Sequence, residues 1–138
     1  MKTTYINIFL RFSLAIGFLS AVADRFGIWP KENSTWGDWS TFLAYTATIN
    51  PWIPDYFINT VAILATVAEI IFALFLIVGF KTSLFAQLSG YLLLLFGIAM
   101  AITTGIKGPL DYSVFTAAAA AFGLSIITKN SSESGIVK

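Results

Sequence analysis

The chain has 138 residues, of which 57% are hydrophobic and 11% are charged, and its mean hydropathy is +0.82. Ordinary soluble domains have roughly 25% charged residues and need a polar surface, so this composition favours a protein solvated by lipid. The absence of cysteine and histidine excludes disulfides, thiolate nucleophiles, histidine-ligated haem, iron–sulfur clusters and ordinary zinc sites. The net charge of +1 gives no reason to expect nucleic-acid binding.

Four apolar segments follow one another, and each approaches or reaches the roughly 20 residues that cross about 30 Å of hydrocarbon. We predict membrane spans near residues 5–23, 56–79, 83–104 and 111–128. Their length and their lack of alternation favour helices over barrel strands. Only Phe80-Lys81-Thr82 separate the second and third spans, which predicts a tight antiparallel hairpin. The expected fold is all-α, an integral membrane four-helix bundle in residues 1–128, followed by a polar and disordered tail, residues 129–138.

The first segment has a second interpretation. Lys2 and Arg11, then residues 12–20, then Ala21-Val22-Ala23 resemble a signal peptide with an A-x-A cleavage site. Cleavage before Asp24 would leave three spans.

Small residues recur at every fourth position on the first and third segments. They are Ser13, Gly17 and Ala21, and then Gly97, Ala101 and Gly105. Small residues let helix backbones approach closely in lipid, so the stripes predict contact faces and favour a retained first span. Chance recurrence is the alternative, because glycine and alanine are common in spans.

The segment 24–55 is the longest piece outside the spans, and it holds all four tryptophans: Trp29, Trp36, Trp39 and Trp52. Asp38 is placed to cap a short helix with Trp39, Phe42, Leu43 and Ile49 on one side. We expect this helix to lie in the membrane interface, in the first extracytoplasmic loop, where tryptophan is favoured. It serves either as a simple anchor or as a lid over a cavity between the spans.

Basic residues near the span ends give a weak indication of orientation. One side carries Lys2, Lys81, Lys129 and Lys138, and the other carries Arg25, Lys31 and Lys107. Four against three favours cytoplasmic N- and C-termini. The acidic residues Asp24, Glu32, Asp38, Asp55 and Asp111 all fall on the opposite side.

Two ionisable residues lie inside the predicted spans. At 1.5 Å per residue, Arg11 lies about 9 Å deep in the first span and Glu69 about 15 Å deep in the second. An unpaired charge at such depth costs several kcal/mol, so we predict that the two side chains pair with each other. Gln87 and Tyr91, about 6 and 12 Å deep on the third span, are expected to complete the hydrogen bonds of this polar layer.

The polar layer has two interpretations, with Ser13 and Thr66 as further contributors. It is either a structural clamp that fixes helix register, or a site for a polar head group, a quinone carbonyl or a proton. In another alternative, Arg11 extends to the interface and leaves Glu69 protonated and alone.

A second polar cluster is expected on the extracytoplasmic side, where Asp24-Arg25 end the first span and residues 107–112 lead into the fourth. Asp111 is placed to cap the fourth helix. The alternative is an Arg25–Asp111 or Asp24–Lys107 ion pair beneath the tryptophan-rich loop. In that case the cluster forms a ligand mouth together with Trp36, Trp39 and Tyr112. We find no phosphate-binding loop, catalytic triad or metal-binding spacing, so an autonomous enzyme is not expected.

Three stretches of the chain resemble the DoxX family of bacterial and archaeal membrane proteins. They are RFSLAIGFLSAVADRFGIWP at 11–30, AEIIFALFLIVGFKTSLFAQLSGYLLLLFGIAM at 68–100 and GIKGPLDYSVFTAAAAAF at 105–122. The second stretch has a glutamate in a span and a glycine with a basic residue at a short turn. Each motif is degenerate, but their order and spacing over all four spans are fairly specific.

The resemblance implies a four-helix bundle in the bacterial inner membrane. It also implies a quinone- or lipid-associated accessory subunit of a membrane redox complex, with Arg11 and Glu69 at the family's charged positions. Such a protein would bind a quinone or lipid without an intrinsic cofactor, beside a membrane oxidoreductase or further copies of itself. The alternatives are a small proton-coupled transporter that uses Glu69 and a purely structural membrane subunit.

Overall fold

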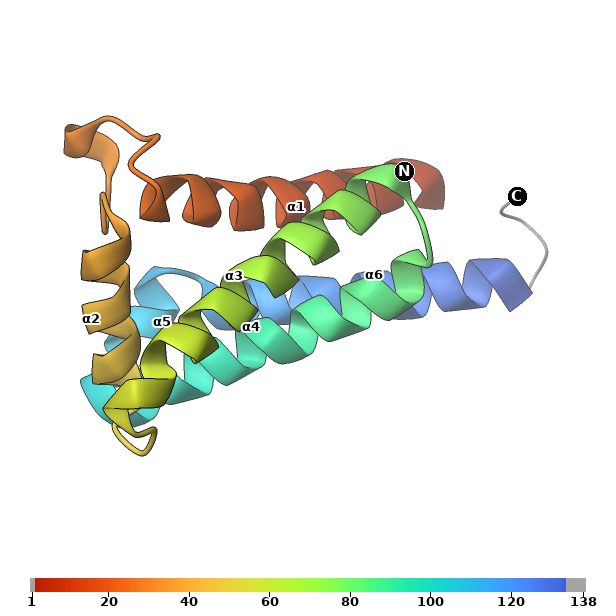
Figure 1. The fold of residues 1–138 in the computed structure, drawn as a ribbon. Coiled ribbons are helices and arrows are strands. Elements are labelled where there is room, and N and C mark those ends of the chain that lie inside the picture. The colour runs from red at the N-terminus through yellow and green to blue at the C-terminus, as the bar shows by residue number, and fades with distance from the viewer. Residues whose placement is uncertain (1, 134–138) are drawn as a thin grey trace.

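Figure 1 shows the computed structural model, which describes residues 2–133. This part of the chain is helical and contains no strand. Its elements are α1 (Thr3–Arg25), the 3₁₀ turn η1 (Lys31–Asn33), α2 (Trp39–Ile49), α3 (Asp55–Val78), α4 (Thr82–Thr104), α5 (Lys107–Asp111) and α6 (Val114–Glu133). The all-α prediction is therefore confirmed for the described residues.

The four long helices lie along one another, and the short elements gather at one end (Figure 1). Helix α1 packs against α3 and α6, and α4 packs against the same two helices. Helix α2 lies across their ends and contacts α1, α3 and α4. We call this the capped end. At the opposite end, the turn end, α1 begins, α6 ends and residues 79–81 connect α3 to α4.

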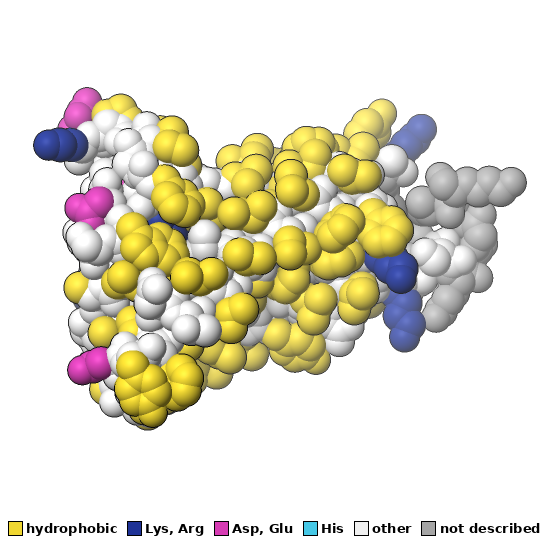
Figure 2. Space-filling view, in the orientation of Figure 1, with side chains coloured by type: hydrophobic (Ala, Val, Ile, Leu, Met, Phe, Trp, Pro, Cys, Tyr) yellow, Lys and Arg dark blue, Asp and Glu magenta, His cyan; other side chains and the backbone are white. Residues whose placement is uncertain are grey.

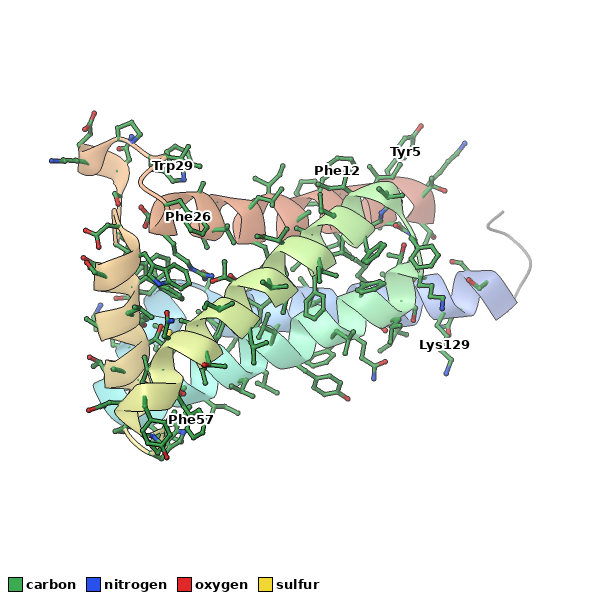
Figure 3. All side chains as sticks on the ribbon, viewed as in Figure 1. Tyr5, Phe12, Phe26, Trp29, Phe57 and Lys129 are labelled. Carbon is green, nitrogen blue, oxygen red and sulfur yellow. The ribbon has the colours of Figure 1, made fainter. Side chains whose placement is uncertain are left out.

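Three helices, α1, α3 and α4, are long and apolar enough to cross a membrane. The apolar part of α6, residues 114–128, extends about 22 Å at 1.5 Å per residue, which is less than the roughly 30 Å of hydrocarbon. Figure 2 shows hydrophobic side chains over the surface between the two ends, with acidic side chains at the capped end. Tyr5 and Phe12 project outward from α1 in Figure 3. This surface suits contact with lipid tails.

The interior is filled by small and branched apolar side chains from all four long helices. The main cluster comprises Leu14, Ala15, Phe18, Ala73, Leu76, Ala86, Ala121 and Leu124. A second cluster of Ile49, Ala99 and Met100 joins α2 to α4. Gly90 and Gly97 of α4 lie directly against the rings of Phe122 and Phe115 of α6.

The predicted small-residue stripes are only partly contact faces. Gly97 makes its predicted close contact, but Gly17 and Gly105 face open space. The stripe on α1 is therefore not a helix contact within the described chain.

The predicted bounds of the first three spans agree with α1, α3 and α4 to within two residues. The predicted fourth span is different, because Ser113 adopts a left-handed conformation with φ +56° and separates α5 from α6. Asp111 ends α5, so the prediction that it caps the last helix is wrong.

Helix α6 continues to Glu133 instead of ending at Thr128. Hydroxyl groups near this end donate to carbonyls one turn earlier, including Ser132 to Thr128 at 3.0 Å. These bonds satisfy the polar side chains within the helix itself. The rest of the predicted tail, with Lys138, lies outside the described residues.

The turn between α3 and α4 is as short as predicted. Gly79 closes α3 with φ +83°, and the backbone N–H groups of Gly79 and Phe80 donate to the Phe75 carbonyl at 2.9 and 3.1 Å. A left-handed glycine at this position is a common helix end. Lys81, with φ +42°, then leads into α4.

Candidate functional site

A buried ion pair joins the end of α1 to the middle of α3. Arg25 and Glu69 are each 2% exposed, and Nη1 of Arg25 pairs with Oε2 of Glu69. The same Nη1 donates to Oγ1 of Thr66 at 2.7 Å, one turn earlier on α3. Two buried charges of opposite sign are far less costly together than apart. Arg25 and Glu69 are the most deeply buried charged side chains among the described residues.

The ion pair keeps hydrogen-bonding capacity that the described residues do not use. The Nε of Arg25 has no hydrogen-bond partner there, and Oε2 of Glu69 has none beyond the ion pair itself. Buried polar atoms normally find partners, so these two atoms distinguish the site from a saturated structural clamp.

Aromatic rings from the tryptophan-rich segment cover the Arg25 guanidinium. Its Cζ lies 4.0 Å from the ring centre of Phe42 and 5.5 Å from that of Trp36. Trp36 meets Phe42 edge-on at 5.1 Å, and Trp39 lies 5.5 Å from Phe42. Stacking of this kind attracts a cation to the ring faces and excludes water from the ion pair.

Asp24 positions this aromatic cover. Its carboxylate accepts a hydrogen bond from the Ser34 hydroxyl and from the backbone N–H groups of Thr35 and Trp36, the last two at 2.9 and 3.0 Å. Two adjacent residues at the end of α1 thus have different roles. Asp24 fixes the loop that carries Trp36, and Arg25 reaches the carboxylate below it.

The predicted Arg11–Glu69 pair is wrong. Arg11 instead caps the end of α3, where its Nε donates to the Leu76 carbonyl at 2.7 Å and its Nη2 to the Ile77 carbonyl at 2.8 Å. The last carbonyls of a helix have no partner within the helix and carry partial negative charge. They therefore satisfy a cation without a carboxylate.

Gln87 and Tyr91 are also absent from the polar layer. Both are exposed on the outer face of α4, where the Gln87 Nε2 donates to the Tyr91 hydroxyl at 3.3 Å. Of the predicted contributors, Thr66 joins the ion pair, through its hydrogen bond with Arg25. Ser13 is exposed on α1.

The predicted mouth residues separate into two groups. Asp24, Arg25, Trp36 and Trp39 gather at the ion pair and its cover, as described above. Lys107 instead pairs with Asp111 one turn away on α5, and both side chains are exposed. Neither of the two predicted cross-helix pairs, Arg25–Asp111 and Asp24–Lys107, is formed.

Sequence reasoning missed Phe42 as the ring nearest to Arg25. Phe42 was predicted to lie on the apolar side of the short helix. The expected burial of that side was the signal that could have placed this ring against Arg25.

Two adjoining grooves of about 490 Å³ each lie beside α1 at the capped end, and they share Ser20 and Trp29. One is apolar, lined by Ile16, Leu19, Ala23, Ile28 and Pro30. The other is lined by Gly17, Ala21, Asp24, Asn33, Thr35, Trp36 and Tyr112. Trp29 lies between them beside the end of α1 (Figure 3), and its Nε1 donates to the Ser20 carbonyl and hydroxyl, both at 3.2 Å. An apolar surface thus continues into a polar one.

Two groups of the cap itself have shifted pKa values. The backbone N–H of Thr41 donates to the Asp38 carboxylate at 2.7 Å and, with the Ser40 hydroxyl, lowers the pKa of Asp38. This confirms the predicted helix cap. Burial raises the pKa of the Tyr45 phenol, and the nearby Tyr112 raises it further.

No protein-family model, curated protein or solved structure matches this chain. The site is therefore interpreted from its own geometry.

Proposed function

We propose that this chain is a four-span membrane protein that binds a quinone or another amphipathic lipid at its capped end, as an accessory subunit of a membrane redox complex. The proposal includes the resemblance to the DoxX family, a bacterial inner-membrane location, and cytoplasmic N- and C-termini.

The four-span topology is supported by the way α6 packs. Helix α6 lies beside α1 and α4 and ends where α1 begins. If α1, α3 and α4 each cross the membrane, the chain is at the capped end after α4. Helix α6 then runs back to the turn end beside them. A short apolar segment is accommodated in a bilayer by local thinning and by polar residues that reach the interface. In this topology α2 lies in the interface plane, with Trp52 and Tyr56 exposed at the same end.

The ligand proposal rests chiefly on the buried Arg25–Glu69 pair beneath Trp36 and Phe42. The free N–H of Arg25 can donate to a carbonyl of a small polar head, and the free lone pair of Glu69 can accept from a hydroxyl. The adjoining grooves match such a molecule, because one side is apolar like a tail and the other is polar like a head. Arg25 and Glu69 do not line the grooves, but Trp36 lines the polar groove and lies over the guanidinium, so a head group reaches the pair by displacing this ring. No other arginine and no lysine lines either groove, so a neutral head is preferred to a phosphate.

The test is purification from native membranes, followed by lipid extraction and mass spectrometry. We expect a quinone or another specific neutral lipid near one per chain. Trp29→Ala, which removes the wall shared by the two grooves, should lower this occupancy. Trp52→Ala is the matched control, because Trp52 is an exposed tryptophan of the same segment outside both grooves. Absence of any specific lipid and of a co-purifying oxidoreductase in the unmodified protein would contradict the proposal.

The ion pair itself is tested with Arg25→Met combined with Glu69→Leu. If the pair only clamps the helices, this variant keeps both its lipid and its assembly. If the pair recognises the head group, the variant folds but loses the lipid.

Proton-coupled transport through Glu69 is the second candidate, because a carboxylate buried within a candidate span can exchange a proton. It predicts flux in proteoliposomes that Glu69→Gln abolishes while the protein remains folded.

A further inference from the structure

The outward face of α4 carries a continuous uncharged row of exposed side chains. They recur at alternating spacings of four and three residues, and they are Leu84, Leu88, Tyr91, Leu95, Ile98 and Ile102. We call these six residues, with the adjacent Gln87, the α4 seam. A repeat of 3.5 residues is the spacing with which two helices pack along their length.

Gln87 and Tyr91 bring polar atoms to this seam. Their mutual hydrogen bond uses one N–H of the amide, and an amide has a second N–H and an acceptor oxygen. At 1.5 Å per residue, Gln87 lies about 7.5 Å and Tyr91 about 13.5 Å along α4 from its first residue. In a spanning helix these groups face hydrocarbon, where no water satisfies them.

The outer face of α3 has the same alternating spacing from Leu64 to Val78, but it contains no exposed polar side chain over that stretch. Its exposed side chains there are Leu64, Val67, Ile71, Leu74 and Val78, all apolar. Lipid tails satisfy that surface fully. The α4 seam, in contrast, contains groups that need a hydrogen-bonding partner within the membrane.

We propose that the α4 seam is the interface of a symmetric homodimer, in which Gln87 meets Gln87 of a second copy. Copies inserted in the same orientation place this residue at the same depth, so a two-fold axis along the membrane normal brings the two amides together. An amide is its own hydrogen-bonding complement, and the uncharged seam creates no repulsion between copies. Polar side chains join transmembrane helices in this way. The inference requires that α4 crosses the membrane, and it is independent of the proposed ligand.

Cysteine cross-linking tests the interface directly, because the chain has no cysteine of its own. Leu88→Cys and Leu95→Cys place one thiol on the seam, and Val67→Cys places one on the outer face of α3 as the matched control. After oxidation in native membranes, we expect disulfide-linked dimers for the two seam variants and few for Val67→Cys. Equal cross-linking on both faces, or none on the seam, would overturn the proposal.

The role of the amide is tested with Gln87→Met, which removes the amide but keeps the size of the side chain. The control is Leu88→Met, which changes a neighbouring seam residue and leaves Gln87 intact. Photobleaching counts in liposomes at several protein-to-lipid ratios give the dimer fraction. We expect Gln87→Met to weaken dimerisation about threefold to tenfold, the range for hydrogen bonds between membrane helices, and Leu88→Met to leave it nearly unchanged. An unchanged dimer in Gln87→Met, with normal circular dichroism, would contradict the role of the amide.

Discussion

Arg11 and Arg25 lie on the same helix, yet the two ends of the molecule accommodate them differently. At the capped end, Arg25 is buried and needs a formal negative charge, Glu69, and two aromatic rings. At the turn end, Arg11 is half-buried and uses only the final carbonyls of α3. The depth of burial therefore decides which partner a guanidinium requires. Among residues 2–133, the buried ion pair lies at the capped end and not at the turn end.

The largest expected effect comes from breaking the ion pair on one side. Arg25→Met leaves Glu69 buried without a counterion, and we expect a loss of about 3–5 kcal/mol of stability. Denaturant titration of the protein in detergent micelles measures it. The double variant Arg25→Met with Glu69→Leu should be more stable than Arg25→Met, because it leaves no unpaired charge. A double variant as unstable as the single one would contradict this account of the pair.

The turn end should be less sensitive. Arg11→Met removes two hydrogen bonds from a charged donor to carbonyls, and we expect a loss of about 2 kcal/mol. Hydrogen exchange should show faster opening of the last turn of α3, while Thr66 and Glu69 keep their protection. If exchange instead rises first around Glu69, then Arg11 supports the buried pair after all.

Gly79→Ala should cost less, about 1 kcal/mol, the lower end of the cost of a left-handed backbone for a residue with a Cβ atom. The new methyl group must adopt φ +83°, and it would lie 2.6 Å from Nη2 of Arg11. The same titration measures the loss. Because the two residues are in contact, the combined variant Arg11→Met with Gly79→Ala should lose less than the sum of the single losses.

The smallest effect concerns the cap of α2. The lowered pKa of Asp38 means that its contribution is complete above the ordinary aspartate pKa of about 3.9 and is lost as the pH falls through the lower value in the folded protein. Amide exchange at Thr41 should therefore accelerate only in strong acid. Asp38→Asn keeps a capping side chain without a titrating group, so its exchange should show no such transition.

The sequence alone was sufficient for the helical class and for three helices long and apolar enough to cross a membrane, because length and composition determine them. It was insufficient for the ion pair, because depth counting treated side chains as points at the height of their Cα atoms. Helical side chains lean toward the N-terminus of their own helix. Arg25 therefore leans from the capped end into the interior, and Arg11 leans away from Glu69 toward the turn end. Glu69, on a helix of opposite direction, leans toward Arg25.

The break between α5 and α6 could not be predicted from local pattern. Ser113 is not a residue type that requires a left-handed conformation, yet its φ is +56°. Similarly, Gln87 and Tyr91 have the correct depth for an internal layer, but the side of α4 on which they lie depends on where α6 packs.

All four tryptophans lie between Trp29 and Trp52, in the segment that forms the capped end. The tryptophan fluorescence of the protein, excited selectively over that of tyrosine, therefore originates from this one end. Lipids that carry a bromine atom near the head group should quench it strongly, and lipids brominated near the chain terminus should quench it weakly. The natural chain thus contains an optical probe of how deeply its capped end sits in a bilayer, without any added dye.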